Sequence, residues 1–207
     1  MKNLLFLLSF LFTFLITNAQ SYRFLYEYTF VPDSTNQSQV SKELMQLDVF
    51  KDHSEFLGDL LAKRDSSMFN VKQKTSNSIG SDLPMGNLFM KIYKGKETYS
   101  FENIGIERYK ISYPTSLKWN LTNETQMIGN YTCQKATLEF GKRHWIAWFT
   151  SEIPYQDGPY IFAKLPGLIV SVEDSRKQHS FVLVGNFRVE KWGSNCSFTN
   201  RVLQIQA

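Results

Sequence analysis

From Asn87 onward the chain is a run of short strand patterns separated by turn signals, and this feature constrains the fold most. Alternating apolar and polar residues are interrupted by Gly95-Lys96, Gly129-Asn130 and Gly141-Lys142. Dipeptides of this kind mark tight turns between antiparallel strands. About ten short strands, each about ten residues from the next turn, predict an antiparallel sheet that is strongly curved or closed. The sequence therefore predicts a mainly β protein.

The stretch Tyr22–Val31 alternates strictly and predicts a strand with one buried face. Its aromatic face carries Tyr22, Phe24, Tyr26, Tyr28 and Phe30. Five rings on one face either pack as core, against a helix or a second sheet, or line an apolar cavity. Both interpretations place this strand at the centre of the molecule.

One amphipathic helix is predicted over Asp52–Arg64, where Phe56, Leu57, Leu60 and Leu61 form an apolar stripe. We therefore expect a single curved antiparallel sheet or half-open β-barrel, with this helix against its concave face. This arrangement resembles the half-open barrel of periplasmic lipoprotein carriers at the level of fold. A β-sandwich is the alternative, which the helix fits less well.

Residues 1–19 have the pattern of a cleavable signal peptide. Lys2 supplies the positive end, Leu4–Ile16 is an apolar run, and Thr17-Asn18-Ala19 forms a small-residue cleavage site. The run is shorter than the ~20 residues that a membrane-spanning helix needs. We expect an exported protein without a transmembrane span in its mature chain, in the periplasm or on the outer-envelope side of a Gram-negative bacterium.

Residues 20–207 suit one β-rich domain. Within it, residues 66–86 are rich in Ser, Asn and Lys and predict a mobile loop. The net charge of +4 is spread along the chain, so no basic stripe for nucleic acid is expected.

The most distinctive stretch is Trp145–Asp174, which packs two tryptophans and three prolines around a tight turn. Its pattern predicts a buried strand, an irregular loop, a turn and a second buried strand. The turn residues are Leu165, Pro166, Gly167, Leu168 and Ile169. Pro followed by Gly suits a type II turn, because Pro presets the first central position and Gly accepts positive φ at the second.

At these residues the chain resembles the GLPGLI family of secreted Gram-negative proteins. The likeness extends upstream through Gly129–Ala136 and Ala147–Thr150, and through the loop residues Glu152-Ile153-Pro154 and Asp157–Tyr160. It implies export and a β-rich fold, and it says little about function because the family has no established activity. The chain departs from the motif at Lys164, which stands where the family name has its first Gly. Either a close backbone approach is lost there, or Lys164 points to water.

The two cysteines, Cys133 and Cys196, permit one disulfide in an exported protein. Such a bridge would close a loop of about 60 residues and stabilise the fold by roughly 4 kcal/mol in the chain-entropy model. The alternative is a small buried Cys133 and a free Cys196 thiol.

Catalytic patterns are not found in the sequence. His53, His144 and His179 lack partners at metal-ligand spacing, and no phosphate loop or dinucleotide fingerprint occurs. We expect no cofactor, no metal and no enzymatic activity. The weak alternative is a hydrolase that uses the loop acids Glu152 and Asp157.

Two functions follow as hypotheses. The first is a non-enzymatic binder or carrier of an apolar or amphipathic ligand, held in the concavity of the sheet. The residues expected to line it are Phe24, Tyr26, Tyr28, Trp145, Trp148 and Phe162. The second is an envelope structural or protein-interaction module that uses loop 151–166 to contact a partner protein.

Overall fold

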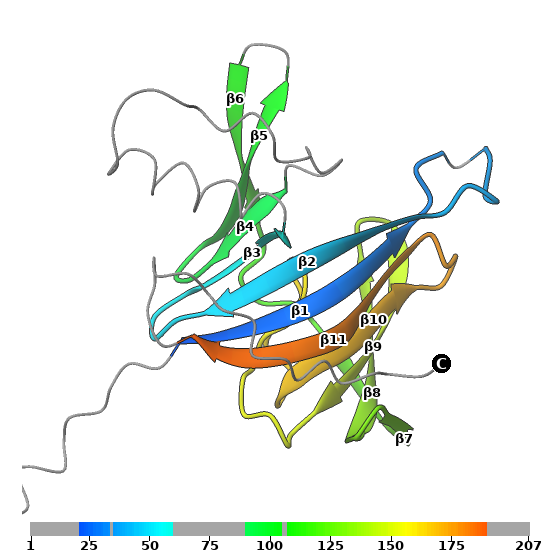
Figure 1. Cartoon of the computed structure of the whole chain (residues 1–207). Helices are drawn as coiled ribbons and strands as arrows, with labels where there is room; N and C mark the ends of the chain where they lie inside the picture. Colours follow the sequence, from blue (N-terminus) through cyan, green and yellow to red (C-terminus); the bar gives the residue numbers. More distant parts are fainter. Residues whose placement is uncertain (1–20, 34, 60–89, 105–106, 190–207) are drawn as a thin grey trace, which may run out of the picture.

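The computed structural model describes residues 21–33, 35–59, 90–104 and 107–189, and the strands in these ranges form one antiparallel sheet (Figure 1). In chain order the strands are β1 Ser21–Phe30, β2 Ser41–Val49, β3 Ser54–Gly58, β4 Lys91–Lys94, β5 Thr98–Ile104, β6 Glu107–Tyr113, β7 Asn120–Ile128, β8 Tyr131–Phe140, β9 Arg143–Thr150, β10 Leu168–Asp174 and β11 His179–Val189.

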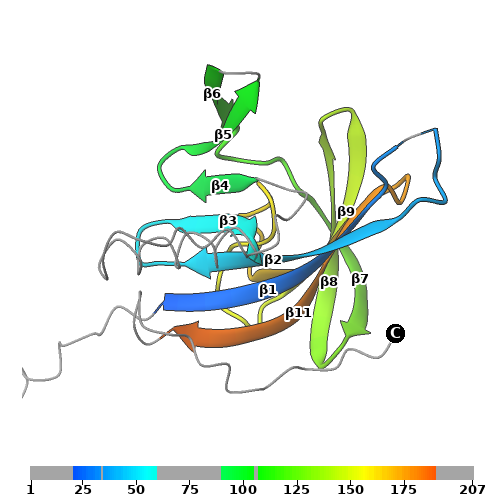
Figure 2. The same cartoon turned by 45° about the horizontal axis from the view of Figure 1, so that its top comes forward.

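The sheet is strongly curved and does not close. Its order is β6-β5-β4-β3-β2-β1-β11-β10-β9-β8-β7, so β6 and β7 are the two edges (Figure 2). The connection 114–119 carries the chain from one edge to the other. The predicted mainly β curved sheet is confirmed, and the sandwich alternative is wrong because the described strands belong to a single sheet.

Strand β1 lies at the centre, between β2 and β11, and its alternation is the predicted one. Phe24, Tyr26 and Tyr28 are buried on the concave face, with exposed fractions of 1%, 0% and 7%. The Tyr26 hydroxyl donates a hydrogen bond of 2.7 Å to the carbonyl of Ile169 on β10. Burying a phenol requires such a partner. The bond therefore fixes β10 against the centre of the sheet.

The predicted helix over 52–64 is wrong where the structure describes it. Ser54–Gly58 is strand β3, paired with β2 on one side and β4 on the other. Phe56 and Leu57 are both buried although they point to opposite faces of β3. Adjacent apolar residues that look like a helical stripe therefore belong to a strand buried on both faces. Residues 60–64, the rest of this helix, lie outside the described residues. The same holds for the predicted mobile loop 66–86 and for the signal peptide 1–19.

Candidate functional site

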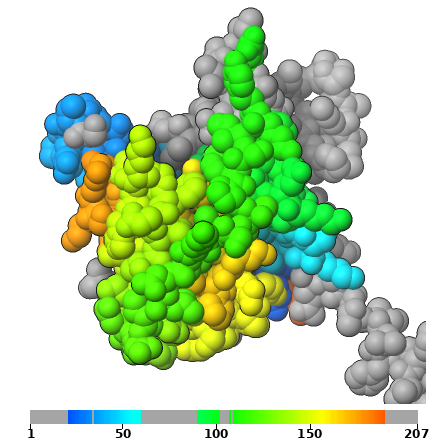
Figure 3. All heavy atoms as spheres, turned by 180° about the vertical axis from the view of Figure 1, so that it is seen from behind, coloured from blue at the N-terminus to red at the C-terminus, as the bar shows by residue number. Residues whose placement is uncertain are grey.

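The loop Ser151–Gly167, which connects β9 to β10 and is called here the plug loop, fills the concave face of the sheet. Ile161, Phe162 and Leu165 are almost fully buried. The Phe162 ring lies 4.7 Å from the Trp145 ring and 5.9 Å from the Trp119 ring. In Figure 3 the yellow and light-orange residues of this region lie below the green residues and beside the yellow-green ones. The plug loop thus takes the place that the sequence assigned to a helix.

A buried ion pair joins the plug loop to β4. The Lys94 ammonium donates to the Asp157 carboxylate, and also to the Gly158 carbonyl at 2.5 Å. Their side chains are only 7% and 14% exposed. Asp157 additionally accepts the Gly158 N–H at 2.8 Å, which fixes the carboxylate in its turn. Because charge-assisted bonds in low dielectric are strong, the pair holds the middle of the plug loop in place.

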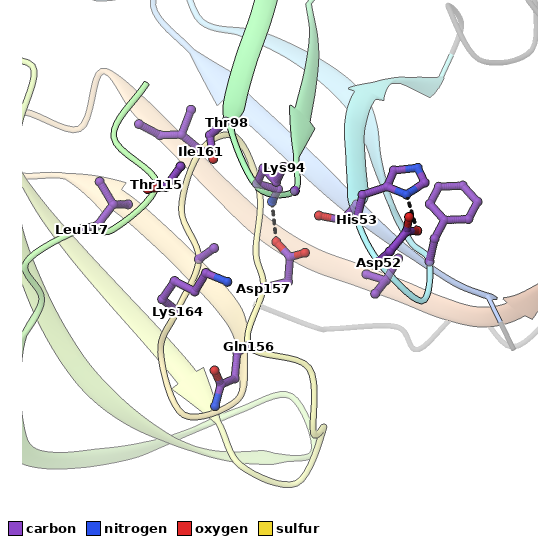
Figure 4. A pocket seen from close by; sticks show the side chains of 15 residues that line it. Asp52, His53, Lys94, Thr98, Thr115, Leu117, Gln156, Asp157, Ile161 and Lys164 are labelled. Carbon is purple, nitrogen blue, oxygen red and sulfur yellow. Dashed lines mark hydrogen bonds and ion pairs between the residues drawn. The ribbon is translucent and has the colours of Figure 1, made fainter. Parts of the chain in front are cut away.

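A pocket of about 180 Å³ opens beside this ion pair, between the plug loop and the ends of β2–β5 (Figure 4). It has an apolar wall and several convergent polar groups. The lining residues are Val49, Phe50, Asp52, His53, Ser54, Lys94, Gly95, Thr98, Thr115, Leu117, Gln156, Asp157, Ile161, Ala163 and Lys164. At a liquid volume of ~30 Å³ per water molecule, the space holds about six waters or a small organic ligand.

The electrostatics of the pocket centre on Lys94. Burial lowers the pKa of Lys94 from its usual value, the Asp157 carboxylate opposes that change, and the positive charge of Lys164 adds to it. Burial disfavours the charged form of an amine, while an adjacent carboxylate favours it. Both lysines line the pocket.

His53 and Asp52 form the opposite side of the pocket. Their side chains share a hydrogen bond of 2.7 Å between His53 Nδ1 and Asp52 Oδ1. The imidazole is stacked between Phe50 and Tyr93, at centroid distances of 4.5 and 4.9 Å. Stacking and the hydrogen bond together fix the ring at the pocket edge. Figure 4 shows the contact between His53 and Asp52.

Five of the six predicted lining residues meet in the interior. Phe24, Tyr26, Tyr28, Trp145 and Phe162 are buried in one continuous core cluster. Trp148 is half-buried and, by strand alternation, points to the opposite side of β9 from Trp145. There the Lys135 ammonium lies 6.0 Å from its ring centroid. None of the six lines the polar pocket.

The motif turn brings the plug loop against the end of β9. Gly167 has a φ of 148°, and its N–H donates to the Leu165 carbonyl at 2.7 Å. This three-residue closure replaces the predicted type II turn, in which φ is near +80°. A Cβ at Gly167 would lie 2.0 Å from the Thr150 carbonyl oxygen. The glycine is needed because two backbone segments touch. Leu165, Leu168 and Ile169 are buried, and Pro166 is exposed.

Cys133 is buried on β8. Burial, with a smaller effect of the Glu152 charge, raises the pKa of its thiol to about 11. Its predicted partner Cys196 lies outside the described residues, so the disulfide stays a prediction.

The two loop acids proposed for a hydrolase are engaged separately. Glu152 accepts the Thr132 backbone N–H at 2.8 Å, whereas Asp157 binds Lys94. His144 contacts Glu139 at 2.6 Å, outside the pocket. Over the part of the chain that the structure describes, no group of three or more His, Cys, Asp or Glu side chains is placed to hold a metal ion.

A second buried polar cluster lies at the β10–β11 turn, away from the pocket. The fully buried Asp174 accepts hydrogen bonds from Arg143 and from the backbone N–H groups of Gln178 and His179. The Tyr28 hydroxyl and His179 Nδ1 are 2.7 Å apart. These contacts satisfy the hydrogen-bonding groups of a buried turn, and we therefore interpret them as structural.

Sequence reasoning missed Lys94, which is the centre of the pocket. One signal could have found it. Lys94 follows Ile92 by two residues in a strand, so both side chains point to the same face. A lysine on the buried face needs an acidic partner, and the conspicuous Asp157-Gly158 turn supplies one.

The fold and the pocket define a mainly β protein, built as one unclosed sheet around an internal loop. One family model, described as a protein of unknown function (Porph_ging), matches residues 139–171. This segment contains β9, the plug loop and the beginning of β10. The match agrees with a resemblance to a family of unknown function, and it does not confirm the GLPGLI name. No curated protein matches the chain.

Two of the solved structures that resemble this chain share its fold at low sequence identity. They are structures of PNGF-II in space groups C2 and P21, with TM-scores of 0.55 and 0.54 and 16% sequence identity. Each match covers 84% of this chain but only 28% or 29% of the PNGF-II chain. This chain therefore spans less than a third of the length of PNGF-II, and the likeness concerns the fold. Within the described ranges, no helix has the length and apolar character that crossing a membrane requires.

Proposed function

We propose that the protein is an exported, non-enzymatic binding protein that takes a small amphipathic ligand into the pocket beside Lys94 and Asp157. The observation that carries this proposal is the pocket itself. It combines an apolar wall with convergent polar groups and a buried ionisable pair, which is the usual composition of small-molecule sites.

The pocket is a better location for the ligand than the concavity expected from the sequence. In the interior, the Tyr28 ring lies 4.2 Å from Phe181 and the Trp145 ring 4.7 Å from Phe162. Rings at these distances are in direct contact with each other. We therefore still propose an amphipathic ligand, as expected from the sequence. We propose that it binds in the pocket and not among the aromatic residues of the core.

The proposal of a non-enzymatic role is supported by how the ionisable groups are paired. The Lys94 ammonium is held by the Asp157 carboxylate and the Gly158 carbonyl. Nδ1 of His53 is engaged by Asp52. Groups fixed in place by such contacts are suited to orienting a polar ligand. Export is supported by the signal-peptide pattern of residues 1–19 and belongs to this proposal.

The second candidate is the envelope interaction module that uses loop 151–166. One observation favours it: Gln156, Asp157 and Lys164 of that loop line the pocket. A partner that inserted a side chain here would contact the same loop. The two candidates differ in the surface that the bound molecule covers. A docked protein would also cover Ser151 and Pro154, which are exposed.

The test is a fragment screen followed by two-dimensional amide NMR on the mature protein. The proposal predicts that bound fragments shift amides of Gln156, Lys164 and Thr98. A Gln156→Trp variant should weaken binding because Gln156 is an exposed lining residue. Ser151→Trp, in the same loop but outside the lining, is the matched control and should bind like the wild type. Fragment shifts confined to other regions, or equal binding by Gln156→Trp, would refute the pocket as the site.

A further inference from the structure

Two lysines from different parts of the chain face the pocket. Lys94 is at the end of β4, and Lys164 is in the plug loop. In Figure 4 the Lys164 ammonium points toward the side of the pocket where Asp157 lies. The Asp157 carboxylate neutralises Lys94, and Asp52 lies beside His53 on the far side. The ammonium of Lys164 therefore adds positive charge on the side of the pocket that Lys94 occupies.

Lys94 retains hydrogen-bonding capacity for a ligand. An ammonium group has three N–H donors. Within the described part of the chain, two of them are used, by Asp157 and by the Gly158 carbonyl. Thr98, Thr115 and Gln156 add side chains that can donate hydrogen bonds to an oxygen ligand.

Lys164 occupies its position in an unfavourable backbone conformation. Its φ is 71°, and its N–H donates to the Gln156 carbonyl at 3.0 Å, which closes the loop around the pocket. For a residue with a Cβ, left-handed backbone costs roughly 1–2 kcal/mol, a cost that glycine avoids. This chain therefore carries an ammonium group at a position where glycine would be less strained.

Strain alone does not distinguish Lys164. Lys142 and Lys177 have φ values of 59° and 56° in the β8–β9 and β10–β11 turns. Neither lines the pocket. Lys164 is the one of these three lysines whose side chain faces the pocket, and Lys142 and Lys177 provide controls for the backbone effect.

We propose that the pocket selects ligands that carry a carboxylate, with Lys164 and Lys94 binding its oxygens while Leu117 and Ile161 contact a short aliphatic part. This inference rests on the proposed function, since it names the charge of the ligand in that pocket. Carboxylates accept strong hydrogen bonds from ammonium groups. The volume of about 180 Å³ suits an acid with a short chain.

The experiment compares hexanoate with hexanamide, which has nearly the same shape without the charge, by NMR titration of the mature protein. Wild type should bind hexanoate roughly tenfold or more tightly than hexanamide, as expected when hydrogen bonds involve charged groups. Lys164→Ala and Lys164→Gly should both lose most of this preference. Lys164→Arg should retain it.

Thermal unfolding separates the side chain from the backbone. Lys164→Gly should raise Tm by roughly 1–3 °C, because it relieves the left-handed strain, whereas Lys164→Ala should not. Lys177→Gly should raise Tm similarly and keep the preference for hexanoate.

The outcomes distinguish the two proposals. If neither probe binds at the pocket, the proposed function fails. If both bind there equally, the binding function stands and the selection of carboxylates is refuted. Retained preference in Lys164→Ala, or lost preference in Lys177→Gly, would also refute the role given to Lys164.

Discussion

Replacing Lys94 by methionine tests whether the buried ion pair holds the plug loop. Methionine keeps most of the side-chain volume and removes the ammonium. The substitution leaves the Asp157 carboxylate, 14% exposed, without its cationic partner, and it leaves the Gly158 carbonyl without that donor. Both groups line or adjoin the pocket, so the change acts on the fold and on the site at once.

The expected loss follows from the burial of both partners. Removing one member of a buried pair typically costs 3–5 kcal/mol, because the other charge is left uncompensated. Since Asp157 keeps some contact with solvent, we expect the lower end, about 3 kcal/mol. For a protein of this size, that loss corresponds to a decrease in Tm of roughly 6–12 °C.

The assay is urea unfolding followed by tryptophan fluorescence, with the Lys94→Met/Asp157→Asn double variant for comparison. Asparagine can still accept the Gly158 N–H, and it removes the stranded charge. We therefore expect the double variant to be more stable than Lys94→Met alone, with a coupling energy of about 1–3 kcal/mol.

The exposed pair of Lys42 and Glu27 is the matched control, with side chains 61% and 44% exposed. Lys42→Met should cost less than ~1 kcal/mol, as surface pairs do. If Lys94→Met costs no more than Lys42→Met, the ion pair does not hold the plug loop and the reasoning is refuted.

Three further predictions concern other parts of the fold. Burial and a nearby arginine lower the pKa of His179 from 6.5, so the folded state binds fewer protons than the unfolded state below that pH. The contribution of His179 to the free energy of unfolding should therefore be fully present above about pH 6.5 and should be lost as the pH falls through the folded pKa. In urea titrations, His179→Gln should reduce this dependence of the free energy of unfolding on pH. Gly167→Ala should cost about 3 kcal/mol or more, because the new Cβ would collide with backbone. Gly141→Ala, with φ of 61° and open space, should cost about 1–2 kcal/mol; similar costs in urea unfolding would contradict the close approach. Trp145→Ala should cost roughly 3–5 kcal/mol, and the half-buried Trp148→Ala clearly less; the reverse order would show that the faces of β9 are misassigned.

The central strand could be predicted because apolar and polar residues alternate along it. The segment that forms β3 was predicted as a helix because its apolar residues are adjacent in the sequence. Tyr22–Phe30 has one buried face, so its period of two is visible in the sequence. Phe56 and Leu57 are buried on opposite faces of β3, and this removes the alternation. Local pattern cannot tell such a strand from a helix, because pairing with β2 and β4 decides the outcome.

The pocket was less predictable than the fold, because its parts come from distant segments. The sequence identifies Asp157 as a loop acid and Lys164 as a departure from a motif. Their relation to Lys94 depends on the plug loop folding back onto β4, a long-range contact that no local spacing encodes. The aromatic residues that were expected to line a cavity instead pack as core, which composition alone does not distinguish.

Hydrogen exchange of the plug loop, measured by mass spectrometry on the mature protein, tests the central claim most directly. The amides of Phe162, Lys164 and Ile169 are hydrogen-bonded to backbone carbonyls within or beside the loop. We predict that peptides covering 158–169 exchange about as slowly as those of β1 and β11, because buried hydrogen-bonded amides open only with the surrounding structure. Exchange much faster than in β1 and β11 would show that the loop does not fill the sheet, and the pocket built on it would not exist.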